Sequence, residues 1–244
     1  MENKPLILSH RGRGDHNLPE NTIEACELAI EQGADALEVD VRFCASGELV
    51  IFHDLFFKRM IGKKGSIWST SLTDLKQFNL NKNAGPAIRI PTLKEFINHF
   101  KGTVPINLDA KVFTPVAGQF AKYIVRAIKG SGNRSQFWVS SFNPVFLRTV
   151  KYCSWDIRTG YLFEHFDMLR RFTEPFWYVD YWHPEINIVN EHFLKLAAAK
   201  EKNIYVWAND EKDMSHALSI NLVKGIITDY PQVLSKKNGQ NPNN

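Results

Sequence analysis

The alternation of short apolar runs with segments of helical periodicity limits the possible folds of this chain more than any other feature of its sequence. Eight apolar runs have the length of buried strands, and they are Leu6–Leu8, Ala36–Val41, Val104–Leu108, Gln136–Ser140, Ile157–Leu162, Phe176–Asp180, Ile204–Trp207 and Val223–Thr228. Helix-period segments lie between them, at 20–33, 93–100, 115–129, 143–152, 165–172, 191–200 and 211–218. Repeated βα units favour a parallel sheet, and eight units favour its closure into a TIM (β/α)₈ barrel of the α/β class. A doubly wound open sheet is the alternative, but no GxGxxG fingerprint follows the first strand.

Residues 55–90 interrupt this alternation. They follow an accessory strand predicted over Glu48–Phe52, and their glycines and Asn-rich patch form no regular pattern. Irregular stretches of that length are uncommon inside a compact domain, so we interpret the segment as a small insertion after strand two. Thr92 and Glu95 have the spacing of a capping box, which predicts that helical structure resumes at Leu93.

The size and charge of the chain narrow the classes of protein to which it can belong. With 44% apolar residues the chain can build one large core, and we expect a single barrel domain over residues 1–234 and a disordered polar tail over 235–244. The net charge is +4, from 30 basic and 26 acidic residues that are scattered along the chain. A nucleic-acid-binding protein usually carries a dense basic stripe, so no nucleic acid is expected as a partner. No sequence feature favours one oligomeric state.

The cysteines and the hydropathy pattern indicate a compartment. The number of cysteines, three, is odd, and no CxxC spacing occurs, which favours free buried thiols over a disulfide framework. No apolar run approaches the roughly 18 residues that span a bilayer, so stable membrane insertion is not expected. These patterns predict a cytoplasmic protein.

Polar residues gather where the predicted strands end. In a TIM barrel the chemistry lies at the C-terminal ends of the strands. In this chain those ends carry Ser9-His10-Arg11, Glu38-Val39-Asp40, His53-Asp54, Asp109-Ala110-Lys111, Ser140-Ser141, Trp207 and Thr228-Asp229. Randomly placed surface charge would not select these positions, so the pattern predicts a reactive site at one mouth of the barrel.

Three of these residues are carboxylates that suit a metal ion. Side chains two apart on a strand share a face, so Glu38 and Asp40 point the same way. Together with Asp109 they would repel one another strongly without a cation between them, and all-oxygen ligation suits Mg²⁺ or Ca²⁺. The alternative is that Glu38 and Asp40 form structural salt bridges with Arg11 or Lys111, and that Asp109 only pairs with Lys111.

His10 and His53 are the titratable pair at the same mouth. Two histidines can divide the roles of general acid and general base near neutral pH, although each alone is also consistent with a hydrogen-bonded loop histidine. Arg11 suits a phosphate because its fork matches paired oxygens. We interpret three other histidines as surface or loop residues, and they are His16, His165 and His183. Four tryptophans are interpreted as core or rim packing, and they are Trp68, Trp155, Trp177 and Trp182.

Several of these segments together resemble a known signature. The ordered motifs are His10-Arg11-Gly12, Pro19-Glu20-Asn21-Thr22, Glu38-x-Asp40, His53-Asp54, Pro91-Thr92-Leu93-x-Glu95, Val139-Ser140-Ser141-Phe142 and Thr228-Asp229-Tyr230-Pro231. In this order they closely resemble the glycerophosphodiester phosphodiesterase family over about residues 6–233. The family usually has Glu where this chain has Asp109.

The resemblance implies a TIM barrel that hydrolyses a small glycerophosphodiester to glycerol 3-phosphate and an alcohol with help from a divalent ion. By position it assigns acid/base roles to His10 and His53 and the metal to Glu38 and Asp40, while Asp109 is expected as the third ligand from the carboxylate cluster itself. It implies that Arg11 and Lys111 hold the phosphate and that Trp207 contacts the substrate, while Glu20 and Asn21 set the first loop and the outer shell of the metal. The attacking group would be either the glycerol 2-hydroxyl or water, and either histidine can be the base.

Two other functions compete with this interpretation. A lysophospholipase D-like hydrolase on the same fold would act on lipid phosphodiesters, and apolar residues of the insertion, such as Phe56, Phe57 and Trp68, would then cover an acyl chain. A catalytically silent barrel would only bind a phosphoester. The intact histidine pair and the three carboxylates argue against the silent barrel.

Overall fold

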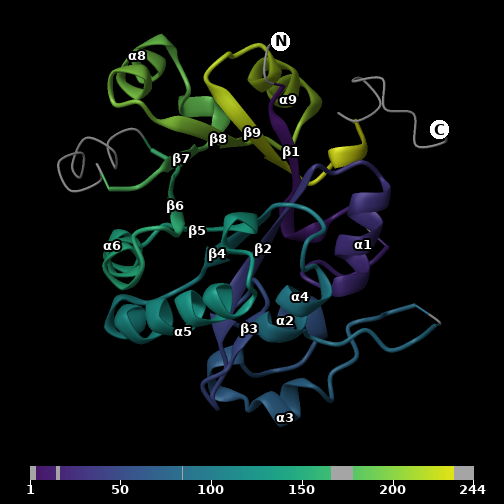
Figure 1. Ribbon diagram of the computed structural model, residues 1–244. Coiled ribbons are helices and arrows are strands. Elements are labelled where there is room, and N and C mark those ends of the chain that lie inside the picture. The colour runs from purple at the N-terminus through teal and green to yellow at the C-terminus, as the bar shows by residue number, and fades with distance from the viewer. Residues whose placement is uncertain (1–3, 15–16, 84, 166–177, 234–244) are drawn as a thin grey trace.

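The protein is a closed parallel barrel with one antiparallel strand added to it (Figure 1). The computed structural model describes residues 4–14, 17–83, 85–165 and 178–233. The barrel strands are β1 (Leu6–Ser9), β2 (Ala36–Phe43), β4 (Ile106–Ala110), β5 (Phe137–Ser141), β6 (Arg158–Phe163), β7 (Tyr181–Pro184), β8 (Asn203–Trp207) and β9 (Val223–Thr228). Neighbouring strands pair in parallel, and β1 pairs with both β9 and β2, which closes the barrel. This confirms the predicted TIM barrel. The accessory strand β3 (Leu49–Ile51) runs antiparallel to β2.

Helices surround the barrel on its outside (Figure 1). The larger ones are α1 (Ile23–Glu31), α4 (Leu93–His99), α5 (Ala117–Gly130), α6 (Pro144–Cys153), α8 (Glu191–Ala199) and α9 (Glu211–Leu218). The capping box predicted at the start of α4 is present, because the Thr92 hydroxyl accepts from the Glu95 N–H and the Glu95 carboxylate accepts from the Thr92 N–H. Helix α1 begins at Ile23 rather than at residue 20, because Thr22 caps it and Asn21 has a left-handed backbone with a φ of 60°.

Part of the prediction between β6 and β8 was wrong. The strand expected at 176–180 is found at Tyr181–Pro184, and pairing with β6 begins with the Asp180 N–H donating to the Thr159 carbonyl at 2.9 Å. The run at 176–180 has the stronger β-propensity, but the tertiary register with β6 selects the residues that follow it. Phe176, Trp177 and most of the helix expected at 165–172 lie outside the described residues.

A cluster of aromatic rings packs together with Leu8, Ala36 and Ile227 of the barrel strands. The ring centroids of Trp138 and Tyr205 are 5.5 Å apart, and those of Tyr181 and Tyr205 are 4.9 Å apart. His183 stacks on Tyr205 at 5.4 Å and is fully buried within β7, so its interpretation as a surface or loop residue was wrong. Gly160 makes this possible, because a Cβ there would lie 2.4 Å from the His183 ring. Burial lowers the pKa of His183 to about 3, so the ring is neutral.

Residues 55–90 have a small core of their own. Phe57, Ile67, Leu75, Leu80 and Ile88 are buried together with three residues of the β2–β3 region, Cys44, Val50 and Phe52. The segment contains α2 (Lys58–Ile61) and α3 (Leu72–Leu75), and it lies beside β3 and α4 (Figure 1). The segment is therefore a structured insertion attached to β3 by shared packing.

The three cysteines are free thiols, as predicted. Of the tryptophans interpreted as packing residues, Trp182 is buried in the core, while Trp68 and Trp155 are exposed, as is His165. His16 lies outside the described residues.

Within the described residues, no helix combines the length and the apolar character that crossing a membrane requires.

Candidate active site

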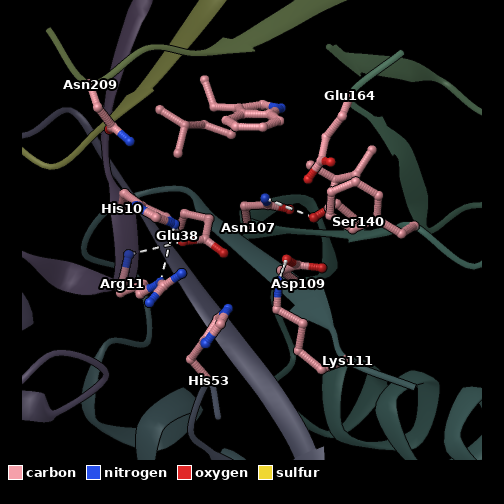
Figure 2. A pocket seen from close by; sticks show the side chains of 14 residues that line it. His10, Arg11, Glu38, His53, Asn107, Asp109, Lys111, Ser140, Glu164 and Asn209 are labelled. Carbon is pink, nitrogen blue, oxygen red and sulfur yellow. Dashed lines mark hydrogen bonds and ion pairs between the residues drawn. The ribbon is translucent and has the colours of Figure 1, made fainter. Parts of the chain in front are cut away.

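The polar ends of the strands surround one cavity of about 280 Å³ at the C-terminal mouth of the barrel. Its walls are formed by His10, Arg11, Glu38, His53, Asn107, Asp109, Lys111, Ser140, Phe142, Leu162, Glu164, Trp207, Asn209 and Ile227. Figure 2 shows the labelled polar side chains of this group arranged around a common space. The cavity thus contains all the site residues expected from the sequence except Asp40, which lies directly beside it.

The three carboxylates converge because two adjacent strands place them side by side. Asp40 of β2 is the register partner of Asp109 of β4, and Glu38 lies two residues before Asp40 on the same face. One oxygen from each carboxylate lies within 4.8 Å of the others. Glu38, Asp40 and Asp109 are 3%, 0% and 4% exposed, so little solvent screens their repulsion.

Cations of the protein neutralise this cluster only in part. The Lys111 ammonium lies 2.5 Å from one Asp109 oxygen and 3.1 Å from an Asp40 oxygen, and Arg11 lies 3.5 Å from Asp40. Burial and the neighbouring Asp40 carboxylate raise the pKa of Glu38 to about 8. Burial also raises the pKa of Asp109 against the opposing effect of Lys111. Of the salt bridges considered from the sequence, those of Asp40 with Lys111 and Arg11 and that of Asp109 with Lys111 are present. Within the described part of the chain, no ion pair joins Glu38 to either side chain, and Glu38 accepts from the Arg11 backbone N–H instead. Three carboxylates therefore share two cationic side chains.

A divalent cation fits this donor set. The ligand atoms are all carboxylate oxygens, which hard cations prefer. The second oxygen of Asp109 is buried and, among the described residues, has no hydrogen-bond partner, so it is free to accept a cation. The Asn21 side chain orients Asp40 from behind, since its Nδ2 donates to an Asp40 oxygen at 2.8 Å and its Oδ1 accepts from the Asp40 N–H at 2.9 Å.

The two histidines are held in the same way on different sides of the cavity. The Nδ1 of His10 lies 2.6 Å from Asp229, and the Nδ1 of His53 lies 2.8 Å from Asp54. A carboxylate at Nδ1 favours the tautomer with the proton on that nitrogen, which leaves Nε2 as the proton acceptor. In His10 this Nε2 also accepts from the Arg11 Nε–H at 3.2 Å. For His10, burial lowers the pKa, but Asp229 and Glu38 outweigh it and the net shift is upward. For His53, burial prevails and lowers the pKa.

Strained backbone positions Arg11 at the edge of the cavity. Arg11 has a φ of 56°, in the left-handed region, and its N–H donates to Glu38 at 2.9 Å. Gly12 follows with a φ of 66°, and a Cβ there would lie 2.2 Å from the Cys26 sulfur of α1. The His-Arg-Gly sequence therefore needs glycine at its third position, because the chain passes α1 there without room for a side chain.

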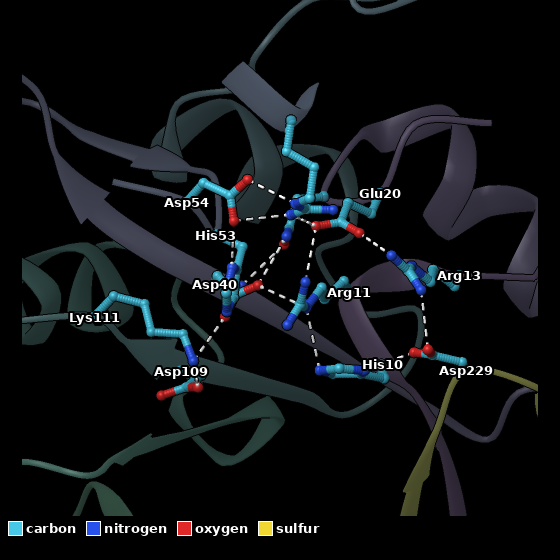
Figure 3. A network of polar contacts seen from close by, with 12 residues as sticks. His10, Arg11, Arg13, Glu20, Asp40, His53, Asp54, Asp109, Lys111 and Asp229 are labelled. Carbon is cyan, nitrogen blue, oxygen red and sulfur yellow. Dashed lines mark hydrogen bonds and ion pairs between the residues drawn. The ribbon is translucent and has the colours of Figure 1, made fainter. Parts of the chain in front are cut away.

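A chain of ion pairs behind the cavity connects the two histidines (Figure 3). Arg13 bonds both Asp229 and Glu20, and Arg59 bonds both Glu20 and Asp54. Three arginines outweigh burial and lower the pKa of Glu20 to about 2. We did not predict Arg13 or Arg59 from the sequence, because their partners lie far away in the chain or in the insertion.

The remaining wall contains further residues that the sequence did not single out. Asn107 donates to the Ser140 hydroxyl at 2.9 Å, and Glu164 and Asn209 face the same space from the segments that follow β6 and β8 (Figure 2). The position of Glu164 and Asn209 just after strands is the signal that could have identified them, whereas Asn107 lies within β4. Trp207, which was predicted, lines this wall as well.

Comparison with known proteins places this arrangement in a family. Residues 10–233 match the model of the glycerophosphoryl diester phosphodiesterase family. A glycerophosphodiester phosphodiesterase of Caldanaerobacter subterraneus subsp. tengcongensis is 30% identical over 247 aligned positions, which cover 95% of this chain and 96% of the relative.

Solved structures show the same fold. A phosphodiesterase of Oleispira antarctica in complex with the product sn-glycerol-3-phosphate superposes with a TM-score of 0.81 at 24% identity, over 96% of both chains. A glycerophosphodiester phosphodiesterase of Parabacteroides distasonis superposes with a TM-score of 0.80 at 21% identity, over 97% of this chain and 98% of the other.

Proposed function

The chain belongs to the glycerophosphoryl diester phosphodiesterase family, and on that basis we propose that it hydrolyses glycerophosphodiesters to glycerol 3-phosphate and an alcohol. The observation that carries the proposal is that two carboxylate-held histidines and a cluster of three buried carboxylates meet at one cavity. A phosphoesterase needs both sets, because it must move protons and neutralise an anionic reacting group.

Glu38, Asp40 and Asp109 would hold the divalent cation, Mg²⁺ or Ca²⁺. When bound, such an ion supplies positive charge to the phosphoryl oxygens. Arg11 and Lys111 line the cavity beside the carboxylates and are placed to bind the same phosphate. Trp207, Leu162 and Phe142 form its apolar wall and would exclude water from the rest of the substrate.

The histidines divide the proton transfers. One accepts a proton at Nε2 from the attacking hydroxyl, and the other donates a proton from Nε2 to the leaving alcohol. Asp229 and Asp54 keep each Nδ1 occupied, which fixes the orientation of the two rings. The attacker is a water molecule, which releases glycerol 3-phosphate directly, or the glycerol 2-hydroxyl, which forms a cyclic phosphate that water then opens. Both routes use the same pair of histidines.

Asp109→Asn is expected to raise the metal concentration for half-maximal activity markedly. The substitution removes one negative charge from a buried three-carboxylate set and leaves the reach of the side chain unchanged. Asp109→Glu is expected to retain most of the activity, because it keeps the charge and Ca²⁺ in particular tolerates changed geometry. Titration of turnover with metal checks both variants. An unchanged half-maximal concentration in Asp109→Asn would mean that Asp109 pairs only with Lys111.

An apolar groove next to the cavity favours a second candidate, a lysophospholipase D-like hydrolysis of monoacyl phosphodiesters. Lys111 and Phe142 line both the cavity and the groove, which continues past Phe113 and Val145. Phe113 is 52% and Val145 50% exposed, so the Phe113 ring and the Val145 methyl groups are available to an acyl chain. Within the insertion, Phe57 and Ile67 pack inward, while Phe56 and Trp68 are exposed.

Turnover of a substrate panel tests the two candidates. The first predicts that glycerophosphocholine and glycerophosphoethanolamine are cleaved with a higher kcat/KM than lysophosphatidylcholine, and the second predicts the reverse order. Absence of turnover of all three diesters with Mg²⁺ or Ca²⁺ present would contradict both and would favour a silent phosphoester-binding barrel.

The three free thiols support a reducing, cytoplasmic location for either activity.

A further inference from the structure

Arg59 of the insertion makes three hydrogen bonds to two carboxylates, although its side chain is about half exposed. Its Nε donates to one oxygen of Asp54 at 2.7 Å, and its terminal nitrogen donates to the other at 2.9 Å. The same terminal nitrogen donates to Glu20 at 2.6 Å. The three bonds join the insertion to two different loops of the barrel (Figure 3).

From these contacts we infer that Arg59 is a positioning residue for His53, which acts by holding Asp54 in the orientation that Asp54 needs to bind the His53 ring. The inference rests on the proposed function, in which His53 transfers a proton. The insertion then has a role in catalysis, because one of its residues holds the carboxylate that orients the His53 ring.

Asp54 depends on Arg59 because it has few other partners. Among the described residues its carboxylate bonds only to His53 and Arg59, and one oxygen accepts from both. Asp54 follows β3 in a loop segment, so no strand pairing fixes its side chain. Without the guanidinium, rotation of the Asp54 carboxylate would release the Nδ1 of His53.

The other histidine has a matching arrangement built entirely from the barrel. Asp229 holds His10, Arg13 holds Asp229, and Arg13 bonds to Glu20 on the opposite oxygen from Arg59. Glu20 is thus a shared anchor for both arginines. The His53 half differs in that its arginine comes from the insertion.

The insertion itself places Arg59. Its helix α2 is capped by Gly62, which has a left-handed backbone with a φ of 75°, and the neighbouring Met60 and Ile61 pack against the insertion core. The position of Arg59 therefore follows from the packing of residues 55–90. Arg59 does not line the active cavity, so an effect on catalysis would have to pass through other residues.

Steady-state kinetics of Arg59→Ala and Arg59→Lys on glycerophosphocholine test the inference. Arg59→Ala is expected to lower kcat by roughly 10- to 100-fold, the range for a misplaced catalytic group, with KM within about threefold. Arg59→Lys keeps the charge but lacks the planar fork, so it is expected to recover only part of kcat. Arg89→Ala is the matched control, because Arg89 is an exposed arginine of the same insertion that bonds to the Gln77 carbonyl. It is expected to leave kcat unchanged.

A double-mutant cycle separates positioning from a merely structural role. If Arg59 acts through His53, then Arg59→Ala changes kcat by less than about twofold in a His53→Ala background. An equal loss in both backgrounds, a wild-type kcat in Arg59→Ala, or a rise in KM at constant kcat would overturn the inference. A wild-type kcat in His53→Ala alone would instead contradict the proposed function, so the two failures are distinguishable.

Discussion

His10→Ala and His53→Ala are each expected to lower kcat by roughly 10²–10⁴, the range for a lost general acid or base. Both rings line the cavity, and both are fixed at Nδ1 by a carboxylate, at 2.6 Å from Asp229 and at 2.8 Å from Asp54. A histidine held in this way keeps Nε2 for proton transfer, and alanine has no group that can replace it. The loss should appear in kcat more than in KM, because neither ring carries the main charge for phosphate binding.

His99→Ala is a suitable control for the two histidine variants. His99 also pairs with a carboxylate, Glu27, at 2.7 Å, but it lies on α4 and is exposed. It should retain wild-type kinetics. A folded His10→Ala or His53→Ala protein with near-wild-type kcat would remove that residue from the mechanism and would turn it into a hydrogen-bonded loop histidine.

Chelation of divalent ions is expected to reduce turnover by at least about 10²-fold, and added Mg²⁺ or Ca²⁺ is expected to restore it. Metal-ion catalysis contributes several kcal/mol of charge stabilisation, and each ~1.4 kcal/mol corresponds to a factor of ten in rate. The need for an ion follows from three buried carboxylates with ligand atoms within 4.8 Å of one another, which Lys111 and Arg11 neutralise only in part.

Metal binding can also be measured without turnover. A ligand that binds only the folded state raises the melting temperature with concentration, so Mg²⁺ or Ca²⁺ should raise the Tm of the wild type. Glu38→Gln should show a smaller rise, because it lacks one of the three charges. Full activity in excess chelator, together with a Tm that does not respond to metal, would contradict the metal assignment.

The barrel was predictable because its pattern is repeated along the chain. The βα alternation depends on short-range periodicity, and an error in one strand leaves the other units to define the fold. The strand placed at 176–180 illustrates the limit. Its aromatic residues look more strand-like than the Tyr-Trp-His-Pro sequence of β7, and only the register with β6 selects the latter. For the same reason His183 was taken for a loop residue rather than a buried ring.

The site was predictable where its residues share a strand or follow one directly. Glu38 and Asp40 have the period of a strand, and His10, His53 and Asp109 come at strand ends. The ion pairs behind them were not predictable. Arg59 meets Glu20 across 39 positions and Arg13 meets Asp229 across 216, and no local pattern connects such residues. Charged residues of that kind look like ordinary surface charge until the fold brings them together.

Identification of the phosphorus-containing product of glycerophosphocholine tests the central claim most directly. Phosphorus NMR of a completed reaction with Mg²⁺ or Ca²⁺ distinguishes the two phosphomonoesters that cleavage can release. The proposed function predicts glycerol 3-phosphate and free choline, and predicts that the signal is lost in His10→Ala over the same period. Phosphocholine and glycerol, or unchanged glycerophosphocholine in the presence of either metal, would contradict it.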